Sequence, residues 1–261
     1  MDLRALPFCA VLAVFMLLAC DKRITDASAG GNNADPGFDL SHSDPAAVEL
    51  ADSIMVAMGG REAWNEIRFV QWQPAPGRTI VWDKHKGRVR LEIPADGTVA
   101  LFETRTGKGH LRTAAGEITQ PDSLKKKIRY ARNLWLNDSL WLVLPFNLKG
   151  AGITLRYMGE GTLAAGGHKC NVLELTLRPP AKDQYLLYVD LKDNLIKQWA
   201  YSKNGAHPDS PDKYREGDFA RPWDNYKRYG AILLSADRTD HTGPRNVSLP
   251  AQVAEKTFTE F

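Results

Sequence analysis

The sequence predicts an α+β fold: a single domain built on a large curved antiparallel β-sheet, a half-barrel of about ten strands, with helices packed on its concave face. Three observations support this prediction. Apolar residues recur at the two-residue period of strands over much of residues 68–261. Two intervals, residues 45–58 and 121–144, follow the helical period instead. Several strands are apolar on both faces, which predicts further closure of the sheet or a partly filled hydrophobic cleft.

The first helix is expected to begin directly after Asp44, which is a suitable N-cap. Pro45 fits the first helical position, and Gly59-Gly60 ends the helix as glycine commonly does. The buried face is predicted to comprise Val48, Ala51, Ile54, Met55 and Met58. A short second turn over residues 61–67 should carry Trp64 inward.

The strands alternate most clearly in the later part of the chain. Clear alternation covers residues 88–93, 153–158, 173–177, 185–190 and 195–201. The short turn over residues 190–194 predicts that the last two strands form an antiparallel hairpin. The long helix over residues 121–144 interrupts the strands and ends at Pro145, and the polar segment 203–218 is predicted to be an exposed loop.

Residues 1–19 have the features of a secretory signal peptide. Arg4 precedes an apolar run over residues 5–18 that is too short to span a bilayer comfortably. The run ends in Leu17-Leu18-Ala19-Cys20, which resembles the lipobox of bacterial lipoproteins. This resemblance implies lipidation of Cys20 and anchoring to a membrane through its acyl chains; the alternative is a plain secretory signal with a coincidental cysteine.

Residues 20–44 are mostly small and polar, so they cannot bury enough apolar surface to order themselves. We expect them to form a flexible tether, followed by one domain over residues 45–261. The formal net charge of +3, with both signs spread along the chain, gives no support for nucleic-acid binding. A lipidated Cys20 would leave Cys170 as the one other cysteine of the mature chain, so we expect no intramolecular disulfide and a packed Cys170 thiol.

The sequence offers few candidates for metal binding or catalysis. The six histidines are scattered, and the acidic residues of segment 203–218 fit no EF-hand spacing, so we expect no metal and no cofactor. Asp83 and His85 could form a base and its orienting carboxylate, but such a pair is more often a surface hydrogen bond. Ser123 and Lys126 match the Ser-x-x-Lys motif of penicillin-recognising enzymes without its companion motifs, which we interpret as a chance match.

Aromatic residues are the remaining feature, because they are numerous enough to line a cleft between a curved sheet and its helices. Concave apolar sites with few polar groups bind hydrophobic ligands. The candidate cavity residues are Trp72, Trp82, Phe102, Trp135, Trp141, Phe146, Tyr157, Tyr185, Tyr188 and Trp199.

Several runs of the chain together resemble a group of uncharacterised bacterial envelope lipoproteins. These runs are residues 58–64 (MGGREAW), 81–83 (VWD), 87–92 (GRVRLE), 135–146 (WLNDSLWLVLPF), 188–190 (YVD) and 229–235 (YGAILLS). Such proteins are similar to the LolA/LolB-like carriers of outer-membrane lipoproteins. The resemblance implies an open, curved antiparallel sheet around helices with an apolar cavity, and it implies no catalytic residues. The 203–218 insertion departs from the compact carriers.

We therefore expect a non-enzymatic, membrane-anchored lipoprotein of the bacterial cell envelope that faces the periplasm and binds a lipid or another hydrophobic ligand. The sequence does not choose between the inner and the outer membrane. An alternative hypothesis is a structural or interaction lipoprotein that docks a protein partner in an envelope complex through a sheet edge or loop. A third is an envelope hydrolase that uses Asp83 and His85 or Ser123 and Lys126.

Overall fold

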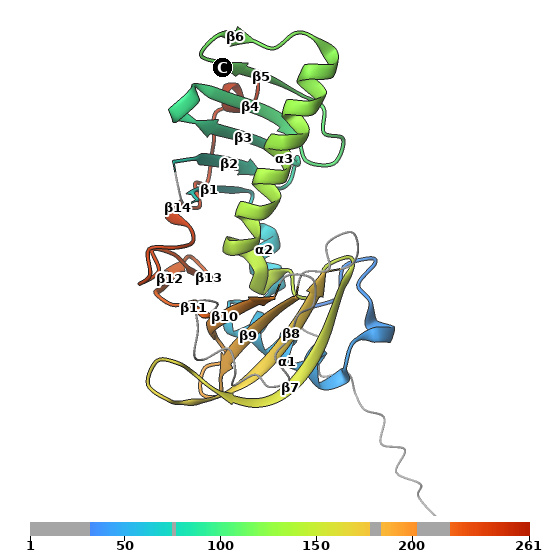
Figure 1. The fold of residues 1–261 in the computed structure, drawn as a ribbon, viewed down its shortest axis with the longest axis vertical. Coiled ribbons are helices and arrows are strands. Elements are labelled where there is room, and N and C mark those ends of the chain that lie inside the picture. The colour runs from blue at the N-terminus through green and yellow to red at the C-terminus, as the bar shows by residue number, and fades with distance from the viewer. Residues whose placement is uncertain (1–31, 75–76, 178–183, 203–219) are drawn as a thin grey trace, which may run out of the picture. The chain divides into compact units, whose positions relative to one another are not determined.

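The computed structural model describes residues 32–74, 77–177, 184–202 and 220–261. Within these residues lie three α-helices, a seven-stranded sheet, a five-stranded sheet and a two-stranded ribbon (Figure 1). Every strand pairing in the two larger sheets is antiparallel. The predicted α+β class is confirmed, with the strands divided between two open sheets.

The helices form where the sequence predicts them. They are α1 (Pro45–Ala57), α2 (Arg61–Glu66) and α3 (Pro121–Val143). On α1, the predicted face is buried at Ala51, Ile54 and Met55, and Met58 at its C-cap is buried too. The Gln120 side chain caps α3 by accepting a 2.6 Å hydrogen bond from the Ser123 N–H. Helix α3 lies along the seven-stranded sheet and contacts β4 and β5 (Figure 1).

The seven-stranded sheet contains strands from the early part of the domain and one strand from its late part. In spatial order its strands are β14 (Arg245–Ser248), β1 (Phe69–Gln73), β2 (Thr79–Asp83), β3 (Arg88–Ile93), β4 (Thr98–Glu103), β5 (Gly109–Thr113) and β6 (Gly116–Glu117). The neighbours from β1 to β6 follow one another in the sequence, as in hairpins. The pairing of Gln71 with Ser248, by contrast, brings the end of the chain beside its first strand.

The five-stranded sheet also follows sequence order. Its strands are β11 (Ala220–Pro222), β10 (Ile196–Ser202), β9 (Gln184–Asp190), β8 (Lys169–Leu177) and β7 (Ile153–Thr162). The ribbon pairs β12 (Tyr226–Tyr229) with β13 (Ile232–Ser235). The predicted hairpin of β9 and β10 is confirmed, and the tight turn between them contains Asn194 at φ 55°.

The part of the predicted tether that the structure describes, residues 32–44, is packed against the domain. The backbone N–H groups of Asp39 and Asp44 donate to the carbonyls of Ile153 and Leu155 on β7, at 3.2 and 2.9 Å. These bonds cover the outer edge of β7, so the flexible tether does not extend as far as residue 44. Composition alone misses this, because backbone hydrogen bonds need no apolar side chain.

A segment near the C-terminus covers the second face of the seven-stranded sheet, which explains in part why some strands are apolar on both faces. One face of the seven-stranded sheet packs into the main core through Val70 and Trp72. On the other face, Phe69 and Val81 pack with Phe258 of the C-terminal 3-10 helix η6 (Glu255–Phe258). The apolar residues on that second face are therefore buried under the chain's own C-terminus and do not line a cavity.

The five-stranded sheet also carries a small apolar cluster outside the main core. Cys170, Val172 and Tyr188 are fully buried there, so the predicted packing of the Cys170 thiol is confirmed. Over the described part of the chain, no helix is both long and apolar enough to cross a membrane.

Candidate functional site

The site is a pocket of about 350 Å³ at which α3, the five-stranded sheet and the loop between β13 and β14 meet. We call it the indole pocket because Trp141 of α3 and Trp199 of β10 line it. The other residues of its lining are Pro74, Arg78, Asn137, Asp138, Arg238, His241, Thr242, Gly243 and Pro244. Its volume falls within the range of pockets that bind small ligands.

The two indoles supply the apolar wall. The ring centroids of Trp141 and Trp199 are 4.1 Å apart, with the planes inclined by 44°. Tyr185 of β9 supports both rings at 5.9 and 6.4 Å, and Trp223 lies 6.3 Å from Trp141. Tyr185 and Trp223 are buried, whereas Trp141 and Trp199 are only partly buried. The pocket is therefore the open side of a packed aromatic cluster, whose rings hold one another in place.

An arginine–aspartate pair forms a second part of the wall. Arg78 precedes β2 and reaches Asp138 on α3 through two hydrogen bonds of 2.7 Å, a bidentate arrangement. The hydrogen bonds that Arg78 donates to Asp138 raise the pKa of Arg78, against the effect of burial. The two charges neutralise each other, and the pair ties the seven-stranded sheet to α3.

A second arginine of the pocket is differently placed. Arg238 is 1% exposed and contributes from the loop between β13 and β14. Burial lowers its pKa to about 10, so the guanidinium remains protonated at neutral pH. Among the described residues no carboxylate forms an ion pair with it.

Most of the aromatic candidates predicted from the sequence do not line this pocket. Trp141 and Trp199 do. Buried in the main core or packed against it are Trp72, Trp82, Phe102, Trp135, Phe146 and Tyr185. Tyr188 belongs to the separate small cluster, and Tyr157 is 36% exposed on β7 with its hydroxyl donating to Asn171 Oδ1 at 2.8 Å. Neither Tyr157 nor Tyr188 lines the indole pocket.

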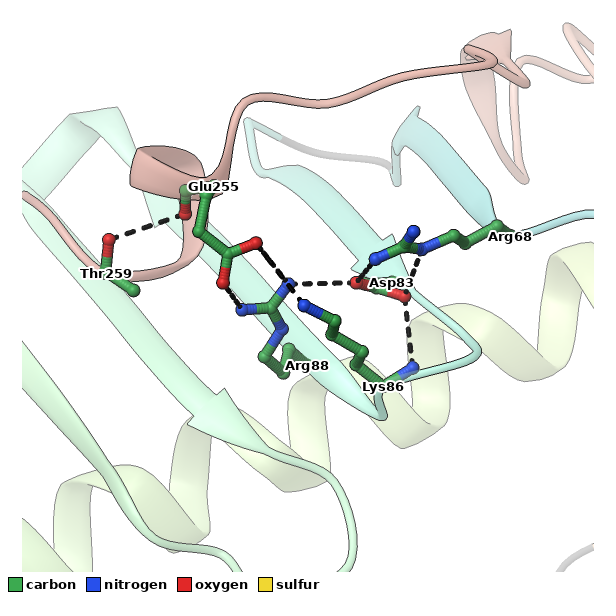
Figure 2. A network of polar contacts seen from close by, with 6 residues as sticks. All are labelled: Arg68, Asp83, Lys86, Arg88, Glu255 and Thr259. Carbon is green, nitrogen blue, oxygen red and sulfur yellow. Dashed lines mark hydrogen bonds and ion pairs between the residues drawn. The ribbon is translucent and has the colours of Figure 1, made fainter.

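The structure separates the candidate catalytic residues. Figure 2 shows the Asp83 carboxylate held by Arg68 at 3.1 Å, by Arg88 at 3.0 Å and by the Lys86 N–H at 3.1 Å. Burial tends to raise the pKa of Asp83, but these hydrogen bonds outweigh it and lower the pKa to about 2. His85 instead contacts the Asn65 carbonyl at 2.9 Å through Nε2. Asp83 therefore does not orient His85 as a base.

The network around Asp83 holds the C-terminal segment on the sheet. Arg88 also pairs with Glu255 at the start of η6, and Lys86 approaches the same carboxylate at 3.6 Å (Figure 2). The Arg88 guanidinium lies 4.7 Å above the Phe258 ring, a cation–π contact. These charges are satisfied within the protein, and they fix the cover over Phe69.

The other candidates for chemistry have no organised site. Ser123 and Lys126 are exposed in the first turns of α3. Within the described ranges, no three His, Cys, Asp or Glu side chains gather closely enough to hold a metal ion. The acidic segment 203–218 lies outside the described residues.

Similarity to known proteins is confined to the fold. No protein-family model matches the sequence, and the search of curated proteins gives no match. Among solved structures, one similar to this chain is a DUF1329 family protein from Desulfovibrio piger, with 12% identity and a TM-score of 0.39 over 83% of this chain and 98% of that one. Another is a putative outer membrane lipoprotein-sorting protein domain from Vibrio parahaemolyticus, with 10% identity and a TM-score of 0.40 over 82% and 97%. MucB matches 82% of this chain and 62% of its own, with 14% identity and a TM-score of 0.27.

Sequence reasoning found two residues of the pocket and missed Arg78, Asp138 and Arg238. Each lies alone in the sequence without a motif, and 60 residues separate Arg78 from Asp138. One sequence feature could have indicated Arg238. The Gly243-Pro244 dipeptide follows it by five residues and predicts a tight loop, which can turn the Arg238 side chain back toward the domain.

Proposed function

We propose that this chain is a non-enzymatic, membrane-anchored lipoprotein of the cell envelope that binds a hydrophobic ligand in the indole pocket. Cys20 would carry the acyl chains, as its lipobox-like context suggests. The choice between the inner and the outer membrane stays open.

One observation carries the proposal: Trp141 and Trp199 lie side by side and line a pocket of about 350 Å³. Indole surface that faces water is costly, and covering it with apolar ligand atoms gains about 25 cal/mol per Å². The rings are also fixed in advance by Tyr185 and Trp223, so a ligand would meet a wall that does not need ordering.

The polar groups of the pocket support binding rather than catalysis. Arg78 and Asp138 satisfy each other, and this arrangement positions groups without preparing either for proton transfer. Partner docking through the β7 edge has less support, because residues 39–44 already cover this strand.

The test uses the full chain with Cys20→Ser, which removes the predicted acylation point. The neutral probe N-phenyl-1-naphthylamine should become fluorescent on binding, and Trp199→Ala should weaken its affinity about tenfold. Tyr157→Ala is the matched control, since it removes an exposed aromatic ring far from the pocket lining. Equal affinity in Trp199→Ala and the parent chain would refute ligand binding at this pocket.

A further inference from the structure

The Arg238 guanidinium is in close contact with two parts of the chain. Its Cζ lies 3.8 Å from the centroid of the Trp223 ring. A Cβ added at Gly243 would come within 3.2 Å of Cζ, Nε and Cδ. The indole and the close backbone at Gly243 therefore both restrict the position of the planar group.

The hydrogen bonds of Arg238 leave part of the group unused. Nε donates to Ser235 Oγ at 2.9 Å, and Nη2 donates to the Trp141 carbonyl at 2.7 Å. An arginine has five N–H donors. No described residue accepts from Nη1, and Nη1 is not among the fully enclosed polar atoms. Arg238 lines the indole pocket, and Nη1 is the guanidinium nitrogen with no accepting group among the described residues.

Among the residues that the structure describes, no carboxylate forms an ion pair with Arg238. Asp224 and Asp240 are near enough to act on it electrostatically, but both carboxylates accept other hydrogen bonds, from Thr239 and Thr242 respectively. The charges of Arg78 and Asp138 in the same pocket neutralise each other. Burying an unpaired charge is costly, and burial accounts for the lowered pKa of Arg238. An anion that entered the pocket would relieve this cost.

We propose that the ligand of the indole pocket is an anionic amphiphile whose carboxylate or phosphate headgroup binds Arg238 Nη1 while its apolar part lies against Trp141 and Trp199. This inference rests on the proposed function and adds the chemical class of the ligand. The two indoles and the Arg238 guanidinium line the same pocket, so a single molecule can contact both. The fixed guanidinium recognises the headgroup and the indoles recognise the chain.

The test compares decanoate with decan-1-ol, which share a chain and differ in headgroup charge. Both are titrated by calorimetry into the full chain with Cys20→Ser, at one salt concentration. Decanoate should bind at least about tenfold more tightly than the alcohol, because a hydrogen bond to a charged group is worth more than a neutral one. Acetate and inorganic phosphate alone should bind far more weakly than decanoate. Decyl phosphate should bind at least as well as decanoate.

Arg238→Gln should abolish the preference for decanoate over decan-1-ol. Arg228→Gln is the matched control, because Arg228 is an exposed arginine of the adjacent ribbon. Arg238→Lys keeps the charge but loses the planar fork, so it should retain part of the preference.

Each outcome separates the two proposals. Equal binding of decanoate and decan-1-ol to the parent chain refutes the anionic headgroup and leaves the hydrophobic pocket standing. Binding of neither refutes both. Acetate or phosphate binding as tightly as decanoate would show a free-anion site and refute the amphiphile. The comparison of ligands on the parent chain keeps the test decisive if Arg238→Gln does not fold.

Discussion

Two regions of this protein contain buried or partly buried charged groups that differ in how their charges are paired. On the outer face of the seven-stranded sheet, Asp83 is fully buried and takes hydrogen bonds from Arg68 and Arg88, and Glu255 completes the network (Figure 2). In the indole pocket, Arg238 is equally buried and has no ion-pair partner among the described residues. A network of paired charges stabilises a fold, whereas an unpaired charge at a pocket leaves binding energy for a ligand. The contrast predicts that mutations in the first region change stability and mutations in the second change affinity.

Replacing Asp83 with alanine should give the largest effect on stability. Removal of the carboxylate leaves two arginines beside a buried site, and breaking such a pair costs about 3 kcal/mol. Urea unfolding measures the loss. Glu160→Ala, which breaks the exposed pair with Lys169, is the control and should change the free energy of unfolding by less than about 1 kcal/mol. A similar loss in both variants would contradict the distinction.

The same carboxylate predicts an acid dependence of stability. The pKa of Asp83 is lowered to about 2 in the folded chain, from its usual value of 3.8. Its contribution is complete above pH 3.8 and disappears as the pH falls through 2, because only the unfolded chain takes up the proton in that window. Between pH 5 and pH 2 the parent chain should lose about 2 kcal/mol more than Asp83→Asn, as measured by urea unfolding at each pH. Parallel losses in the two chains would show that Asp83 does not titrate in this way.

Gly243→Ala should disturb the pocket more than the fold. Gly243 (φ +81°) and Gly230 (φ +60°) both adopt the left-handed conformation, so alanine costs each about 1 kcal/mol. At Gly243 the new methyl group would also press on the Arg238 side chain, whereas nothing lies within 4 Å at Gly230. Gly243→Ala should weaken decanoate binding about fivefold and Gly230→Ala should not, by calorimetry. If both variants bind alike, the close approach to Arg238 has no role in binding.

Asp138→Asn converts the neutralised pair of the pocket into a second unpaired arginine. The variant should be modestly less stable, because Arg78 loses its partner. It should bind decanoate about threefold more tightly, since one negative charge leaves the pocket wall. Glu160→Gln removes a distant exposed charge and should leave affinity unchanged. Weaker decanoate binding by Asp138→Asn would mean that the Arg78–Asp138 pair shapes the pocket more than its charge does.

Local signals made much of the fold predictable. Asp44 and Pro45 mark the start of α1 and Gly59-Gly60 follows its end, so the helix could be predicted without any tertiary information. The hairpin of β9 and β10 follows from a short turn in the same way. The pairing of β1 with β14 could not be predicted, because the two strands are far apart in the sequence.

The candidate site was predicted only in its apolar half. Aromatic side chains can be identified in the sequence, but packing decides which of them lie at a pocket. Trp135 packs against Trp82 and Phe102 and is buried. Trp141 and Trp199 are only partly buried. The proposed role of Arg238 depends on the absence of a carboxylate partner among its described neighbours. No sequence pattern records a missing counter-ion.

The most direct test of the central claim is to identify the ligand that the protein carries. The chain and its Arg238→Gln variant would be purified from native membranes, and the small molecules released on denaturation would be identified by mass spectrometry. The account predicts a stoichiometric anionic amphiphile in the parent chain and its loss from the variant. A neutral lipid retained equally by both, or no ligand in the parent chain, would contradict it.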